Sequence, residues 1–206
     1  YFVIVNFIRF TLMDNSIADI SKVNQLKPKK GRLLLAEPFM LDDHFSRSVI
    51  FICEHNKDGS YGFIINNQLN LNLDEILPDS SLPSLDVFYG GPVHASNLFY
   101  IHQYGDIIND SIKIAENIWT GGDFNQLTEY LDLKIIDSNK IKFFLGYSGW
   151  SKNQLKEEMK TNSWIISEGI GDKIFSNNKN FWKDILEKKG GRYKAIANFP
   201  LNPSDN

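Results

Sequence analysis

The feature that most constrains the fold is a short apolar run at residues 49–53, followed at once by a turn and a second apolar run. The first run reads Val-Ile-Phe-Ile-Cys and is hydrophobic at every position, which is typical of a strand covered on both faces. Residues 56–60, Asn-Lys-Asp-Gly-Ser, are of the types that form tight turns. The sequence therefore predicts a β-hairpin of strands 45–53 and 61–66, with the first strand in the interior of a sheet.

Strands and helices are interleaved along the rest of the chain. The patterns predict strands at 32–36, 86–89, 98–102, 140–147 and 163–167, two short strands around Asn109-Asp110, a helical turn at 73–77, and helices at 123–131, 151–160 and 181–189. In the helix at 151–160 we expect Glu157 and Glu158 to point outward. Hairpins outnumber the long crossovers that parallel strands need. We therefore predict an α+β fold with a bent, mostly antiparallel sheet and flanking helices.

Composition and charge limit the kinds of partner. The 206 residues are 42% hydrophobic and 23% charged, which suits one folded domain. A net charge of −3 disfavours a general binder of nucleic acid, so a small molecule or a protein is the favoured partner. No stretch approaches the roughly 20 apolar residues of a membrane-spanning helix, and no membrane partner is expected. The single cysteine cannot form an internal disulfide, which indicates a reducing, cytoplasmic location.

Residues 1–30 are interpreted as an N-terminal extension of a single domain at 31–206. Apolar residues spaced by three predict a helix at 14–26, stopped by Pro28. The first methionine is Met13, and we expect translation to start there, with residues 1–12 as upstream read-through or added, non-native sequence.

Polar side chains gather where the first hairpin strand ends, at Glu54, His55 and Asn56. On a regular strand Glu54 and His55 point to opposite faces, whereas Cys53 and His55 share one. A catalytic Cys-His pair also needs a third group to orient the imidazole, and the sequence shows none. A buried, structural cysteine is the favoured interpretation. At the other end of the strand, Arg47 is expected to anchor a carboxylate or loop carbonyl, with anion binding as the alternative.

A second polar stretch, Gly-Tyr-Ser-Gly-Trp at 146–150, is predicted to be a turn after an apolar strand. A nucleophile elbow needs glycine two residues before and two after the serine, and position 150 is Trp. All four histidines precede Ser148 and lack metal-ligand spacing. We therefore assign no catalytic residue, no metal and no cofactor. The glycine pairs at 90–91 and 121–122 are interpreted as ordinary turns, with binding of an anion by their backbone amides as the alternative.

Taken together, these motifs resemble the AlgH/YqgE family of small bacterial proteins. The stretches that carry the resemblance are residues 31–38, 54–56, 62–66, 90–93, 121–124 and 144–150, in collinear order over 31–206. The resemblance implies a compact α+β fold whose bifurcated sheet forms a pseudo-barrel. It carries the label of transcriptional regulator from one member, but no established reaction, ligand or catalytic residue. The chain departs from the family pattern at Asn67-Gln68 and Lys152-Asn153.

The sequence thus favours a non-enzymatic, cytoplasmic binding or regulatory protein whose working surface is a cleft where three polar turns converge. The candidate residues of that cleft are Arg47, Glu54, His55, Asn56, Gly90, Gly91, Tyr147, Ser148 and Trp150. Two alternatives stay open. One is an enzyme that acts on a small anionic metabolite with Glu54 or His55 and Arg47. The other is direct DNA binding through the basic clusters at 27–32 and 188–194.

Overall fold

The computed structural model describes residues 26–40, 42–78 and 82–198, so the helix expected at 14–26 lies outside it except for its last residue. The strands are β1 (Leu33–Ala36), β2 (Val49–His55), β3 (Gly59–Ile64), β4 (Gln68–Asn72), β5 (Asp86–Tyr89), β6 (Val93–His102), β7 (Ile112–Ala115), β8 (Ile118–Thr120), β9 (Ile141–Ser151) and β10 (Trp164–Ser167). The helices are α3 (Leu73–Ile76), α4 (Phe124–Asp132), α5 (Gln154–Lys160), α6 (Phe181–Lys189) and α7 (Gly191–Ala197), with 3₁₀ turns η1 (Ser138–Lys140) and η2 (Gly171–Phe175).

All ten strands join one sheet, in the order β10-β1-β2-β3-β9-β6-β8-β7, with β4 and β5 branching from this path. The pairs are antiparallel except for β5 with β9, so the predicted α+β class with a mostly antiparallel sheet is confirmed. Over the described residues the path runs from β10 to β7 without closing. The sheet is therefore bent and branched but open.

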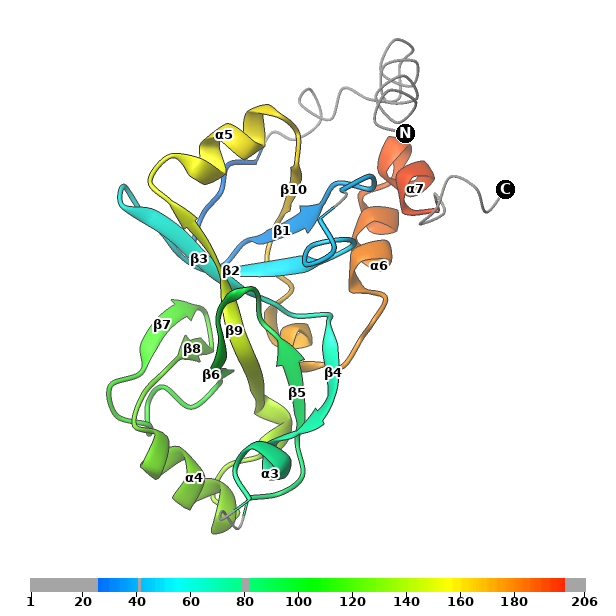
Figure 1. The fold of residues 1–206 in the computed structure, drawn as a ribbon. Coiled ribbons are helices and arrows are strands. Elements are labelled where there is room, and N and C mark those ends of the chain that lie inside the picture. The colour runs from blue at the N-terminus through cyan, green and yellow to red at the C-terminus, as the bar shows by residue number, and fades with distance from the viewer. Residues whose placement is uncertain (1–25, 41, 79–81, 199–206) are drawn as a thin grey trace.

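Strand β9 forms the axis of the molecule and joins its two halves (Figure 1). One edge of β9 pairs with β6, while the other pairs first with β5 at residues 143–145 and then with β3 at residues 148–151. The sheet forks where this second edge changes partner. The prediction of a turn at 146–150 is therefore wrong, because pairing of Tyr147 with β6 and of residues 148–151 with β3 continues the strand through this stretch.

The fork brings two glycine stretches into close backbone contact. A Cβ on Gly90 would lie 2.2 Å from the carbonyl oxygen of Gly146, and one on Gly146 would lie 2.3 Å from that of Gly91. Gly146 also has a φ of 69°, which glycine adopts without strain. The Ser148 hydroxyl donates a 3.0 Å hydrogen bond to the Gly90 carbonyl across the same junction. Glycine at these positions lets three strands meet at one point.

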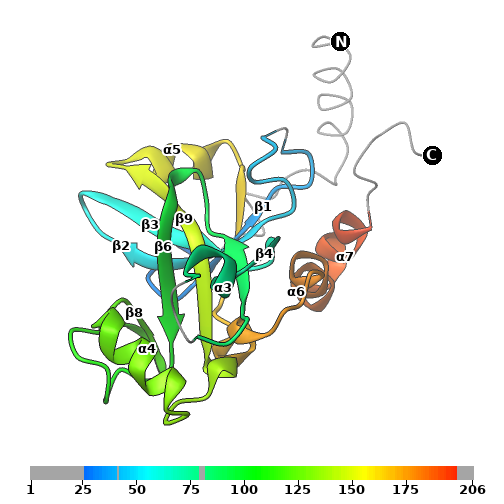
Figure 2. The same ribbon diagram turned by 60° about the horizontal axis from the view of Figure 1, so that its bottom comes forward.

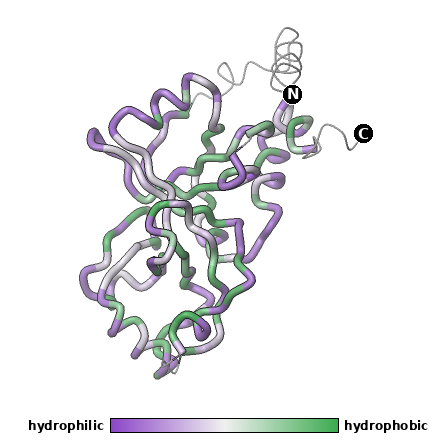
Figure 3. Tube along the Cα trace, in the orientation of Figure 1, coloured by the Kyte–Doolittle hydropathy of each residue, from purple (hydrophilic) through white to green (hydrophobic). Residues whose placement is uncertain are grey.

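The apolar core divides into three clusters, one on each covered surface. The first packs α6 and α7 against one face of β1, β2 and β3, and the third covers their other face with α5 and Trp164. The second lies in the other half, beneath α3 and α4. Figure 2 shows the α6–α7 pair on one flank of the sheet, and Figure 3 shows hydrophobic segments running through the strands with hydrophilic segments at their ends.

Two helices follow directly from their sequences. Asp123 caps α4 by accepting hydrogen bonds from the amides of Asn125 and Gln126, as its position predicts. Helix α6 buries an apolar stripe and ends at Gly190, whose φ is 68°, so this prediction is also confirmed. None of the described helices has the length and apolar character needed to cross a membrane.

Three local predictions need correction. Strand β2 begins only at Val49, because residues 42–47 form turns and Arg47 has a φ of 52°. The β7–β8 hairpin turns at Glu116-Asn117 rather than at Asn109-Asp110. Glu158 does not point outward, because it accepts hydrogen bonds from two indole groups of the third core cluster. Strand β4 and helix α7 were not predicted at all.

Candidate functional site

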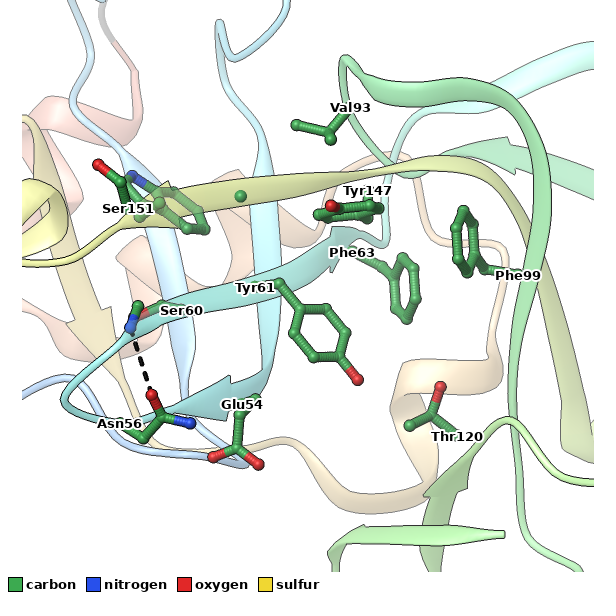
Figure 4. A pocket seen from close by; sticks show the side chains of 13 residues that line it. Glu54, Asn56, Ser60, Tyr61, Phe63, Val93, Phe99, Thr120, Tyr147 and Ser151 are labelled. Atoms are coloured by element: carbon green, nitrogen blue, oxygen red, sulfur yellow. Dashed lines mark hydrogen bonds between the residues drawn. The ribbon is translucent and has the colours of Figure 1, made fainter. Parts of the chain in front are cut away.

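A pocket of about 640 Å³ lies beside the fork, between the β2–β3 hairpin and strands β6 and β9 (Figure 4). Its size is within the usual range for sites that bind small molecules. The residues that line it are Glu54, Asn56, Gly59, Ser60, Tyr61, Phe63, Val93, Phe99, Thr120, Tyr147, Gly149, Trp150 and Ser151.

A β-bulge at Cys53 directs Glu54 into this pocket. Ile52 is paired with Gly62, and Glu54 is paired with Tyr61, the next residue of β3. Cys53 is therefore an extra residue in β2 that has no partner of its own in β3. The extra residue places Glu54 on the same face as Tyr61. His55 then pairs with Ser60 and projects from the opposite face, where a 2.6 Å hydrogen bond joins its Nδ1 to the Ser60 hydroxyl. The expectation that Cys53 and His55 share a face is therefore wrong.

Besides Trp150, four aromatic rings that contact one another line the pocket. Tyr61 and Phe63 are two residues apart on β3 and so point to the same face, Phe99 comes from β6, and Tyr147 comes from β9. The Tyr147 ring meets those of Tyr61 and Phe99 edge to face, with centroid distances of 5.9 Å and 5.6 Å. Phe63 contacts both Tyr61 and Phe99 and is stacked on Phe144, with the ring centroids 4.6 Å apart. Such ring contacts hold the walls in fixed orientations.

Among the described residues that line the pocket, Glu54 is the one charged side chain. Its Oε1 accepts a 3.0 Å hydrogen bond from the His55 amide, and its Oε2 lies 3.6 Å from the Nζ of Lys30. Burial raises the pKa of the Tyr61 hydroxyl, and the negative charge of Glu54 raises it further. Tyr61 therefore stays a neutral hydrogen-bonding group in the lining of the pocket.

The polar rim is built by side chains that hold turns and strand ends. The Oδ1 of Asn56 accepts hydrogen bonds from the amides of Asp58 and Gly59, at 2.8 Å and 3.2 Å, which shapes the hairpin turn. Thr120, at the end of β8, donates its hydroxyl to the Tyr100 carbonyl.

Cys53 lies beneath the pocket and is closed off from it. Its side chain is 1% exposed and its Sγ lies 3.6 Å from the Phe51 carbonyl oxygen. Burial raises the pKa of this thiol far above its ordinary value, outweighing the opposing effect of Lys30. A thiol in this setting is protonated and inert, as the interpretation of a structural cysteine expects.

Glu54, Asn56, Tyr147 and Trp150 are the predicted site residues that line the pocket. Residues 90–91 lie at the fork against the backbone of Tyr147 and Ser148. Along β9 successive side chains alternate, so Tyr147 faces the pocket and Ser148 is buried on the other side of the sheet. Trp150 borders the pocket, but it also packs in the third core cluster.

Arg47 lies at the opposite end of β2 from Glu54. Its guanidinium carbon is 5.1 Å from the centroid of the Trp182 ring in α6, a cation–π contact between the sheet and this helix.

Sequence reasoning missed most of the pocket's walls. Tyr61 and Phe63 could have been found from the sequence, because they are two residues apart on the returning strand of the hairpin and so share one face. Phe99 and Thr120 carry no such signal, since only the pairing of β6 and β8 brings them here. In the part of the chain that the structure describes, no group of three or more His, Cys, Asp or Glu side chains is placed to hold a metal.

Comparison with known proteins places this geometry in context. A family model described as AlgH-like matches residues 33–194. A UPF0301 protein of Parabacteroides distasonis is 40% identical over 183 residues, covering 87% of this chain and 92% of the relative. A UPF0301 protein of Cytophaga hutchinsonii is 36% identical over 176 residues, covering 84% and 97%.

Two solved structures are also similar. The solution structure of the AlgH protein from Pseudomonas aeruginosa aligns with a TM-score of 0.61 and 29% identity, covering 74% of this chain and 84% of that one. The crystal structure of protein DIP2367 from Corynebacterium diphtheriae aligns with a TM-score of 0.72 at 18% identity, covering 87% and 97%, which shows a shared fold.

Proposed function

This chain belongs to the AlgH-like family, and from that premise we propose that it is a non-enzymatic, cytoplasmic binding protein whose ligand is a small molecule held in the pocket at the fork. The observation that carries the proposal is the wall of four aromatic rings, contributed by three strands, around a volume of about 640 Å³. Rings in fixed orientations favour a ligand with a flat or compact apolar part.

The placement of the reactive groups supports binding over catalysis. Of the residues considered for chemistry, only Glu54 lines the pocket, while His55 bonds Ser60 and Arg47 packs on Trp182. General acid–base catalysis needs its groups within reach of one reacting atom. An enzyme that uses Glu54 or His55 together with Arg47 on an anionic metabolite has less support, because these side chains are distributed over both ends of β2.

The position of the pocket supports a regulatory role. Its walls come from the β2–β3 hairpin on one side of the fork and from β6 on the other, with β9 between them. A ligand that contacts all three would stabilise one arrangement of the two halves. A partner protein that binds only this arrangement would then bind in response to the ligand.

Direct DNA binding has less support than a small ligand. Within the basic cluster at 27–32, Arg32 forms a two-bond ion pair with Glu168 and Lys30 lies near Glu54. These carboxylates offset part of the positive charge that phosphate contacts would need. Fluorescence anisotropy with duplex DNA at low salt tests this alternative, which requires binding that falls steeply as salt is added.

The proposal is tested by a ligand-observed NMR screen of the full chain against neutral aromatic fragments. We expect fragments to bind and to raise the melting temperature, since a ligand at 100 times its Kd stabilises by about 2.7 kcal/mol. Tyr147→Ala should abolish binding, whereas Tyr147→Phe, which keeps the ring, should retain it. Binding that survives Tyr147→Ala, or a screen with no binder, would overturn the proposal.

A further inference from the structure

We propose that the pocket recognises an organic cation, an alkylated ammonium group held against the rings of Tyr61 and Tyr147 beside the Glu54 carboxylate. This inference rests on the proposed function and specifies its ligand class. It is carried by the joint placement of one carboxylate and several ring faces around a single hollow (Figure 4).

The charge of the lining favours a cation. Glu54 supplies a negative charge, and the lining contains no Lys, Arg or His among the residues that the structure describes. An anionic ligand would meet this carboxylate without a compensating positive group in the wall. A cationic ligand would gain from it, because the surrounding apolar rings lower the local dielectric constant.

The orientations of the rings favour an alkylated cation over a bare ammonium or a metal ion. The Tyr147 ring is inclined by 75° to that of Tyr61 and by 82° to that of Phe99, so their faces point in different directions around the pocket. Ring faces attract cations, and several faces at steep angles make the kind of cage that binds quaternary ammonium groups. An alkylated nitrogen also loses little hydration and presents apolar surface to the rings.

Lys30 acts as an internal competitor for the same carboxylate. Its ammonium lies 3.6 Å from Glu54, and both side chains are partly exposed, at 29% and 39%. Exposed ion pairs of this kind are weak and are easily exchanged for a better-placed partner. A ligand cation inside the pocket can therefore replace Lys30, and removal of Lys30 should strengthen binding.

The test measures binding of choline and of its neutral isostere 3,3-dimethylbutan-1-ol to the full chain by isothermal titration calorimetry. We expect choline to bind at least about tenfold more tightly, and Glu54→Gln to reduce this preference at least about threefold, leaving the part that the rings provide. Glu157→Gln, which removes the same charge from an exposed site in α5, should leave the preference intact. Lys30→Ala should tighten choline binding roughly threefold, while the matched surface variant Lys160→Ala should leave it unchanged.

Equal affinity for choline and the isostere would overturn the inference and leave the ligand-binding proposal standing. Absence of binding by both probes would also overturn the inference. The screen with neutral fragments would then test the proposed ligand-binding function separately. A preference for choline that is undiminished in Glu54→Gln would overturn the role assigned to this carboxylate.

Discussion

The carboxylate of Glu158 accepts a 2.7 Å hydrogen bond from the indole nitrogen of Trp164. The same Oε2 atom accepts a second bond, of 2.8 Å, from the indole of Trp150 in β9. One side chain of α5 therefore connects the edge strand β10 to the central strand β9. Both indole rings are buried, so this carboxylate is the hydrogen-bond partner that allows them to pack there.

Replacement of Glu158 should destabilise the fold more than its exposure suggests. We expect Glu158→Ala to lower the free energy of unfolding by about 2–4 kcal/mol, because two buried indole N–H groups lose their acceptor. Glu158→Gln, which keeps one oxygen, should cost less. The neighbouring Glu157→Ala should change the free energy of unfolding by less than about 0.5 kcal/mol, since the Glu157 side chain pairs only with exposed Lys160 in the described structure. Urea unfolding measures all three, and equal losses for Glu157→Ala and Glu158→Ala would contradict the assignment.

The fork should tolerate no side chain at Gly146. We expect Gly146→Ala to cost at least about 3 kcal/mol, because the new Cβ would meet the Gly91 carbonyl at 2.3 Å in a backbone of positive φ. Gly121→Ala is the matched control, since Gly121 has a φ of 65° but nothing within 4 Å of an added Cβ. That variant should cost only about 1–2 kcal/mol. Similar melting temperatures for the two variants would show that the fork is not tightly packed.

Lys142 should make stability rise with pH. It is 2% exposed, its ammonium donates to the carbonyls of Ile174 and Ser176 at 3.2 Å and 2.7 Å, and its Nζ lies 3.8 Å from the centroid of the Phe88 ring. Burial lowers the pKa of this group from 10.5 to about 7, against the opposing effect of Asp86. Between these two pKa values the unfolded chain holds a proton that the folded chain has lost.

Raising the pH from 7 to 9 therefore removes a cost of folding, by at most about 1.4 kcal/mol per pH unit. Lys142→Met should flatten this slope, whatever its effect on stability at neutral pH, while the exposed Lys140→Met should keep it. Urea unfolding at pH 7, 8 and 9 provides the measurement. A wild-type stability that falls over this range relative to Lys142→Met would refute the prediction.

The thiol of Cys53 should resist modification in the folded protein. Because the side chain is buried and its pKa is raised, we expect a disulfide reagent such as dithionitrobenzoate to react only as fast as the chain opens. Reaction should be immediate in guanidinium chloride. Rapid labelling of the native protein would show that the pocket reaches Cys53 and would reopen its role in chemistry.

The sequence determined by itself those features that depend on neighbouring residues. The hairpin of β2 and β3, the cap of α4 by Asp123 and the apolar stripe of α6 ending at Gly190 all follow from short-range patterns, and the structure confirms them. The polar end of β2 was also visible, since Glu54 and Asn56 directly follow an unbroken apolar run.

Tertiary structure alone decided the pocket. On a regular strand, His55 would share a face with Cys53 and Glu54 would point to the other face. The bulge at Cys53 exchanges the faces of Glu54 and His55, because the pairing of β2 with β3 includes one extra residue of β2. The change of partner along β9 continues the strand through residues 148–151, and Tyr147 comes into contact with Phe99. Strand register and the choice of neighbour depend on contacts between segments far apart in the chain. Local periodicity does not encode them, although side-chain direction depends on both.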